Sequence, residues 1–114
     1  MSVLTSIIDR TISGSFESDL FFNIRGSAFY KCSKLTSVSF PLATSIGQYA
    51  FYSCRGLTTI YVGTNTSTVC TLSNTNAFIN CTNLTNIYVP ANLVDSYKSA
   101  TNWSSYADKI KATP

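Results

Sequence analysis

Apolar residues in the middle of the chain recur in a short phrase that occurs three times. Each copy opens with Ala-Phe, places a cysteine three residues after the phenylalanine, and places a leucine three residues after the cysteine. The copies begin at Ala28, Ala50 and Ala77, so the period is 22 and then 27 residues. Such a period is typical of repeat architectures, because a single unit cannot bury its apolar edge and must stack on its neighbours. The pattern therefore predicts a solenoid.

The second half of the phrase predicts a β-strand. Apolar residues occupy alternate positions at the end of each copy, in 35–40, 57–62 and 84–89. Alternation places these side chains on one face of a strand and the intervening polar side chains on the other. Stacked copies would align their strands in a parallel sheet, with neighbouring strands about 4.8 Å apart.

The first half of the phrase, Ala-Phe-x-x-Cys, predicts one turn of α-helix or 3₁₀-helix. Its apolar residues are three apart, which suits a single helical turn on the opposite side of the repeat. Phe29, Phe51 and Phe78 occupy the same position in the three copies. We therefore expect their rings to form an internal aromatic ladder with a structural role.

The chain is expected to be a single domain over residues 1–114. Residues 1–23 are predicted to form an irregular N-terminal cap, because the repeat pattern degrades before Ile24. Three repeats are predicted over 24–90. Extra Thr, Asn and Ser residues near 63–76 predict an insertion that bulges from the repeat.

After Pro90 the apolar spacing becomes helical, so residues 91–114 are predicted to form a helical C-terminal cap. Trp103 is expected to cover the apolar end of the last repeat, as terminal units of repeat proteins require. The predicted fold is thus an α+β solenoid. It is a short right-handed array with a parallel β-sheet face, short helical turns and a C-terminal helical cap.

Composition allows a packed core and argues against two classes of partner. The chain is 45% hydrophobic and only 11% charged, with a net charge of +3. Nucleic-acid-binding domains usually cluster Lys and Arg, so we expect no nucleic acid partner. No stretch approaches the roughly 18 apolar residues of a membrane span. The N-terminal residues lack the features of a signal peptide, so we expect a cytoplasmic or virion protein, or else a trimmed fragment of a surface adhesin.

The residues that most enzymes depend on are missing or scattered. The sequence has no histidine, which removes the usual general base and the commonest metal ligand. Its five acidic residues lie outside the regular repeats. We therefore expect a protein that is not an enzyme, with no catalytic residue, no metal and no cofactor.

The four cysteines show neither paired spacing nor a histidine to complete a metal site. Cys32, Cys54 and Cys81 share one repeat position and are predicted to be free thiols in the core, with a disulfide as the alternative. Cys70 falls outside the pattern. It is either buried in its loop or reactive.

The strongest candidate for function is the outward face of the predicted sheet. Tyr61 and Tyr88 fall in register there and would supply rigid, amphipathic contact area of the kind enriched in binding sites. The alternative is that the two rings shield the sheet and improve cross-strand packing. The insertion is a second candidate, as a recognition loop. The predicted partner-binding residues are Ser37, Ser39, Thr59, Tyr61, Asn86 and Tyr88.

The phrase A-F-x-x-C-x-x-L-x-x-[VI]-x-[VF], with Ile-Gly before the Ala-Phe, resembles the BspA-type leucine-rich repeats of bacterial and protist surface proteins. The resemblance covers about residues 24–90 and implies a leucine-rich repeat array. The tail, from Ile87 to Ile110, looks like the helical ending of such arrays in gut Firmicutes and their phages. The resemblance implies adhesion or protein binding, and it implies no catalytic residue.

Three functions stay open on the sequence. The favoured one is a non-enzymatic protein-binding module that uses the exposed sheet face and the insertion loop. In its narrower form, the module is phage-encoded and acts on a host protein. The alternatives are a structural or virion component that assembles through its ends, and a fragment of a bacterial adhesin. The three are separated by the partner, which would be another protein, a second copy or a glycan.

Overall fold

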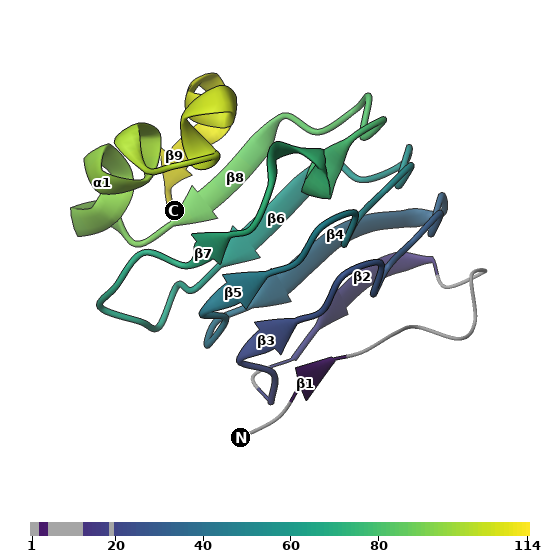
Figure 1. Cartoon of the computed structure of the whole chain (residues 1–114), viewed down its shortest axis with the longest axis horizontal. Helices are drawn as coiled ribbons and strands as arrows, with labels where there is room; N and C mark the ends of the chain where they lie inside the picture. Colours follow the sequence, from purple (N-terminus) through teal and green to yellow (C-terminus); the bar gives the residue numbers. More distant parts are fainter. Residues whose placement is uncertain (1–2, 5–12, 19) are drawn as a thin grey trace.

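The computed structural model describes residues 3–4, 13–18 and 20–114 of the chain. Within these residues it has two parallel sheets, and consecutive strands from β1 to β8 alternate between them (Figure 1). The longer sheet contains β2 (Gly14–Glu17), β4 (Leu35–Phe40), β6 (Thr59–Val62), β8 (Asn86–Val89) and β9 (Ile110–Ala112), in that order. The shorter sheet contains β1 (Val3–Leu4), β3 (Asn23–Ile24), β5 (Ser45–Ile46) and β7 (Thr71–Leu72). The N-terminal cap predicted for residues 1–23 lies partly outside the described residues.

The helices gather toward the C-terminal end. They are η1 (Thr75–Phe78), η2 (Ala91–Leu93), α1 (Val94–Ser99) and η3 (Trp103–Lys109). The sequence predicted a cap that is helical to its end, but the structure returns the chain to a strand, β9, which pairs with β8 (Figure 1). A strand there is favoured because it satisfies backbone groups of β8 that would otherwise face solvent.

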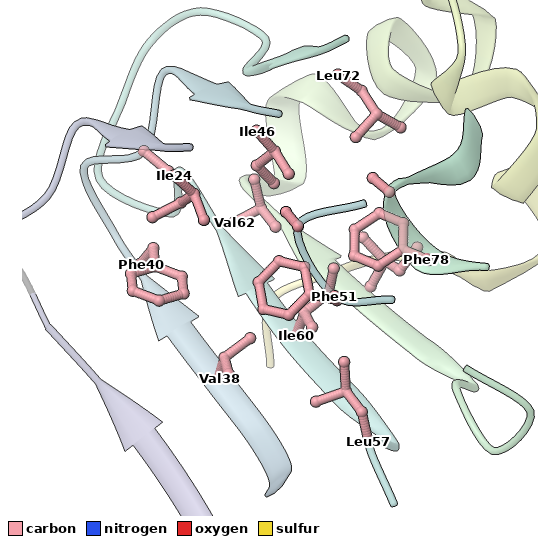
Figure 2. Close-up of a cluster of buried hydrophobic side chains, with 14 of the residues drawn as sticks. Ile24, Val38, Phe40, Ile46, Phe51, Leu57, Ile60, Val62, Leu72 and Phe78 are labelled. Carbon is pink, nitrogen blue, oxygen red and sulfur yellow. The ribbon is translucent and has the colours of Figure 1, made fainter. Parts of the chain in front are cut away.

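The predicted parallel sheet is confirmed in the repeats. In β6 and β8 the burial alternates strictly, and Ile60, Val62, Ile87 and Val89 all point inward. Figure 2 shows side chains of β4 and β6 gathered with those of the shorter sheet around a common core. The residues that it labels there are Val38, Phe40, Ile60 and Val62 from the longer sheet, and Ile24, Ile46 and Leu72 from the shorter one.

The helical turn predicted for Ala-Phe-x-x-Cys differs from what the structure shows. In the first two copies the segment is a run of tight turns, and only the third copy includes a 3₁₀-helix, η1. The N–H groups of Phe29 and Lys31 donate to the carbonyls of Ala50 and Tyr52 in the next copy, at 2.7 and 2.6 Å. A helix would direct these groups along its own axis. The left-handed backbone at Lys31, with φ 59°, also ends any helix there.

The predicted aromatic ladder is confirmed. The rings of Phe29 and Phe51 are stacked with centroids 5.1 Å apart. Those of Phe51 and Phe78, both labelled in Figure 2, are stacked at 5.5 Å. Phe16 extends the ladder at one end by an edge contact with Phe29. Trp103 closes the other end against Phe78, with centroids 6.2 Å apart, and only 1% of its surface is exposed.

The cysteine ladder lies in the core and carries a hydrogen-bonding role. The thiol of Cys54 donates to the Phe29 carbonyl at 3.0 Å, and that of Cys81 donates to the Phe51 carbonyl at 2.9 Å. Cys32 and Cys54 are buried, whereas Cys81 is half-buried. All four cysteines are free thiols, so the disulfide alternative is not what the structure has. A thiol suits this position because it is small, apolar and a weak donor.

We expect Phe51→Ala to lower the free energy of unfolding by about 3–5 kcal/mol, because it removes a fully buried ring that stacks on both neighbours. Urea denaturation followed by circular dichroism measures the loss. The matched control is Phe16→Ala, which removes a half-buried ring at the end of the ladder. Equal losses in the two variants would contradict the central role of the stacked rings.

Candidate functional site

The predicted row of Ser39, Tyr61 and Tyr88 exists on the outer face of the longer sheet. Cα pairing places Ser39 beside Tyr61 and Tyr61 beside Tyr88. The structure adds Glu17 of β2 next to Ser39 and Lys111 of β9 next to Tyr88. Neither residue was predicted from the sequence to lie in this row, because neither β2 nor β9 was predicted. The alternation in Ile110-Lys111-Ala112 was the available signal for β9.

Tyr61 and Tyr88 form a stacked pair at the centre of this row. Their ring centroids are 5.0 Å apart and their planes are inclined by 27°. Both side chains are half-buried. Each ring therefore covers one face of the other.

The second predicted row, Ser37, Thr59 and Asn86, is also in register and half-buried. At its end the Lys111 ammonium donates to Asn86 Oδ1 at 2.5 Å and to the Thr85 carbonyl at 3.1 Å. Lys111 therefore reaches from the row of Tyr61 and Tyr88 to the second row, where it bonds to Asn86. All six predicted binding residues thus lie in two adjacent rows of one face.

A third row, Thr36, Thr58 and Thr85, is exposed at the start of the strands. The Thr58 hydroxyl donates to the Thr36 carbonyl at 3.2 Å, and the Thr85 hydroxyl donates to the Thr58 carbonyl at 3.3 Å. These hydroxyl groups are occupied by the sheet itself. The row therefore contributes a polar, uncharged border to the face.

A hollow of ≈ 360 Å³ lies on the same face, lined by Glu17, Ser18, Ser39 and Pro41. Neither tyrosine lines it, but Ser39, which does, is the register neighbour of Tyr61. No pattern in the sequence predicts this hollow, since it depends on β2.

The predicted insertion does not bulge freely along its whole length. Its second half runs into β7, and the C-terminal cap holds it there. The Cys70 N–H donates to Tyr97 Oη at 2.8 Å, and Trp103 Nε1 donates to the Cys70 carbonyl at 2.6 Å. Asn102 Nδ2 donates to the Leu72 carbonyl at 2.6 Å. Exposed residues alternate with covered ones in this second half, at Thr71, Ser73 and Thr75, and the first half exposes Asn65, Ser67 and Thr68.

The alternatives left open for Cys70 are settled in favour of burial. Its side chain is 1% exposed, and burial raises the pKa of its thiol to about 12. A thiol that stays protonated is a poor nucleophile. A hollow of ≈ 440 Å³ lies between β7 and the C-terminal cap. Asn102 and Trp103 line this hollow and also donate the hydrogen bonds that join the cap to the Leu72 and Cys70 carbonyls.

A second aromatic surface, on the turns, was missed by the sequence analysis. Tyr30 and Tyr52 stack with centroids 4.8 Å apart, and Tyr49 meets Tyr52 edge-on at 5.8 Å. Lys31 Nζ lies 5.4 Å from the centroid of the Tyr30 ring. Ile79 continues the row and is 43% exposed. The repeat position after the ladder phenylalanine was the available signal, but it was assigned to a helical turn.

Short units that contribute alternately to two parallel sheets, and that align equivalent residues in rows, define a repeat protein with an exposed sheet face. The chain belongs to the BspA type leucine-rich repeat family, whose model matches residues 11–112 as six copies. The match extends beyond the 24–90 segment on which the resemblance was based. No curated protein and no solved structure matches the chain.

Leucine-rich repeat modules commonly bind proteins, and the family is generally non-enzymatic. In the part of the chain that the structure describes, no cluster of three or more metal-ligating side chains is found. None of the helices in the described segments has the length and apolar character needed to cross a bilayer.

The contact between the insertion and the cap makes stability sensitive to alkaline pH. Burial raises the pKa of Tyr97 from 10.0 to about 12 and that of Cys70 from 9.0 to about 12. Folding thus favours the neutral forms, so their contribution is complete below pH 9 and is lost as the pH rises toward 12. We expect the free energy of unfolding, measured by urea titration under reducing conditions, to fall over this window.

Tyr97→Phe removes one of the two titrating groups. We expect it to cost about 1 kcal/mol at neutral pH, because the Cys70 N–H loses its acceptor. Between pH 10 and 12 its stability should fall less steeply than that of the unmodified chain. Parallel curves for the two proteins would contradict this prediction, because they would show that folding does not raise the pKa of Tyr97.

Proposed function

We propose that this protein is a non-enzymatic binding module that recognises a protein partner with the outer face of its longer sheet. The observation that carries the proposal is the stacked pair of Tyr61 and Tyr88 at the centre of that face. Stacked, half-buried tyrosines offer large contact area while losing little conformational entropy on binding. A central aromatic anchor with a polar surround is the usual arrangement of a binding hot spot.

The polar residues around the pair would supply directional hydrogen bonds. Ser37, Ser39, Thr59 and Asn86 lie in the same two rows and are partly accessible. The rows between Glu17 and Lys111 carry no charge. Recognition here would depend on shape and hydrogen bonding more than on long-range attraction.

The first half of the insertion would contact the same partner. The N–H of Asn65 donates to the carbonyl of Pro41 at 2.9 Å, which brings this turn beside a residue that lines the hollow on the outer face. The hydroxyl of Thr66 is already bonded within the turn and is not expected to contact the partner. It donates to the carbonyls of Gly63 and Thr68, at 2.8 and 3.0 Å, and so holds the turn.

We further infer that the repeats wind as a right-handed solenoid. The support is the alternation of strands between two parallel sheets, because crossovers between parallel strands are nearly always right-handed. A repeat scaffold of this kind presents its outer rows as one continuous surface.

The narrower form of the proposal is a phage-encoded module that acts on a host protein, supported by the resemblance of the tail to repeat proteins of gut bacteria and their phages. Assembly through the ends is less well supported, because cap side chains already occupy the carbonyl groups of Cys70 and Leu72 along β7. An adhesin fragment would use the same face. It is distinguished from a protein-binding module by the class of ligand captured, which would be a glycan.

The test is capture of a partner from bacterial lysate, with cytoplasm and envelope kept separate, followed by a binding titration with the purified partner. We expect the double variant Tyr61→Ser, Tyr88→Ser to weaken binding by at least about tenfold, as loss of a hot spot does. Its thermal stability should change little, since both rings are half-buried.

The turn surface provides a matched control. Tyr30→Ser with Tyr52→Ser removes a stacked tyrosine pair of nearly the same geometry from a different face. Binding that survives in this control and fails in the Tyr61, Tyr88 variant supports the proposal. Unchanged affinity in the Tyr61, Tyr88 variant would overturn it, and capture of glycans alone would favour the adhesin alternative.

A further inference from the structure

The stack of tyrosines on the outer face ends one strand before the sheet does. Tyr88 and Tyr61 stack at 5.0 Å, but the next residue in the row is Ser39, whose side chain is too small to continue the stack. Glu17 follows Ser39 on β2. Because neighbouring strands are about 4.8 Å apart, a planar group above Ser39 would lie at stacking distance from Tyr61 and beside Glu17.

On its Glu17 side, this position opens into a hollow. The depression of ≈ 360 Å³ is lined by Glu17, Ser18, Ser39 and Pro41. Its floor is fixed by the backbone, since the Ser18 N–H donates to the Ser39 carbonyl at 3.0 Å. The Ser18 hydroxyl accepts from the Leu20 N–H at 3.1 Å and holds the chain that leaves β2. Among the described residues, the hollow therefore has a base held by backbone hydrogen bonds and one carboxylate, and Tyr61 lies on the next strand beyond Ser39.

The charge at this position is unbalanced. Glu17 is exposed, and within the described residues the one ion pair found joins Lys109 and Asp108. The other residues around the hollow are neutral. Lys111 stands at the opposite end of the row, four strand spacings or roughly 19 Å away. That distance exceeds the screening length of about 8 Å at physiological salt, so Lys111 neither neutralises Glu17 nor repels a cation there.

Among protein side chains, arginine matches these features together. Its guanidinium is planar and stacks on aromatic faces, and it pairs with a carboxylate through two parallel N–H groups. Lysine can satisfy the charge but offers no plane to stack. An uncharged aromatic ring can stack but leaves Glu17 without a partner.

The geometry points to an arginine of the partner protein above Ser39, with its guanidinium stacked on Tyr61 and its charge paired with Glu17 at the edge of the hollow. This inference rests on the proposed function, because it uses the same face and names the chemistry of what binds there. It also gives the partner an orientation, since the arginine must lie over β4, on the Glu17 side of the tyrosine pair.

The direct test uses short peptides as probes and needs no identified partner. The peptides Ac-Gly-Ser-Arg-Ser-Gly-NH₂ and Ac-Gly-Ser-Lys-Ser-Gly-NH₂ are titrated into the ¹⁵N-labelled chain, and amide chemical shifts are followed. We expect the arginine peptide to shift the amides around Ser39 and Tyr61, and to bind at least about fivefold more tightly than the lysine peptide, because only arginine stacks as well as pairs. Equal affinity for the two peptides, or shifts elsewhere only, overturns the inference.

Two variants sharpen the test. Glu17→Gln keeps the shape but removes the charge, and should weaken binding of the arginine peptide by at least about fivefold. Ser39→Tyr continues the tyrosine stack into the hollow and should abolish binding. Its matched control, Ser105→Tyr, adds the same side chain at an exposed position of the C-terminal cap, away from this face, and should retain binding. Binding that survives Ser39→Tyr overturns the inference.

The same variants separate this inference from the proposed function. A protein partner that is lost with the Tyr61, Tyr88 variant but kept by Ser39→Tyr would uphold the binding face and overturn the arginine site. Loss of the partner in both variants, with full binding to Ser105→Tyr, supports the two together. Selective binding of the arginine peptide that disappears in Ser39→Tyr supports the site even if the Tyr61, Tyr88 variant leaves capture of the protein partner unchanged.

Discussion

Hydrogen bonds between equivalent backbone groups of successive repeats hold this molecule together. They run through both sheets and continue through the turns, where Phe29 donates to Ala50 and Phe51 donates to Ala77. A repeat cannot satisfy these groups by itself, so each one is completed only by its neighbour. The same bonds force equivalent side chains to lie one above another. The rows of phenylalanine, cysteine, threonine and tyrosine are therefore consequences of a single backbone constraint.

That constraint creates a problem wherever the rows end, because an edge strand has unpaired backbone groups. At β7 the chain solves it with side chains in place of a strand. Tyr97, Asn102 and Trp103 pair with backbone groups of Cys70 and Leu72, and Trp103 covers the last ring of the ladder in the same contact. At β8 the solution is a further strand, β9. The side chains of the cap and strand β9 thus satisfy the backbone groups that a further repeat would otherwise satisfy.

The sequence allowed prediction of the repeated features of the longer sheet and of the core, but not of the shorter sheet or of the tyrosine row on the turns. The strands, the phenylalanine ladder and the register of Tyr61 with Tyr88 follow from spacing alone, because a row needs only equivalent positions. What it could not provide were features set by local backbone geometry. Spacing of three fits a tight turn as well as a helix, and only the left-handed conformation at Lys31 distinguishes them. Glu17 and Lys111 were missed for a related reason, since their strands are short and lie outside the repeated phrase.

Strict alternation in β6 and β8 separates the residues that hold the fold from those that face outward. Substitutions in the outward rows leave the buried rows untouched, so such a sheet can drift through many surface compositions at little cost in stability. Selection could therefore retarget the outer face by point changes or by gain and loss of whole repeats. The separation of buried and outward residues along each strand therefore lets the binding specificity of this face change during evolution while the fold is kept.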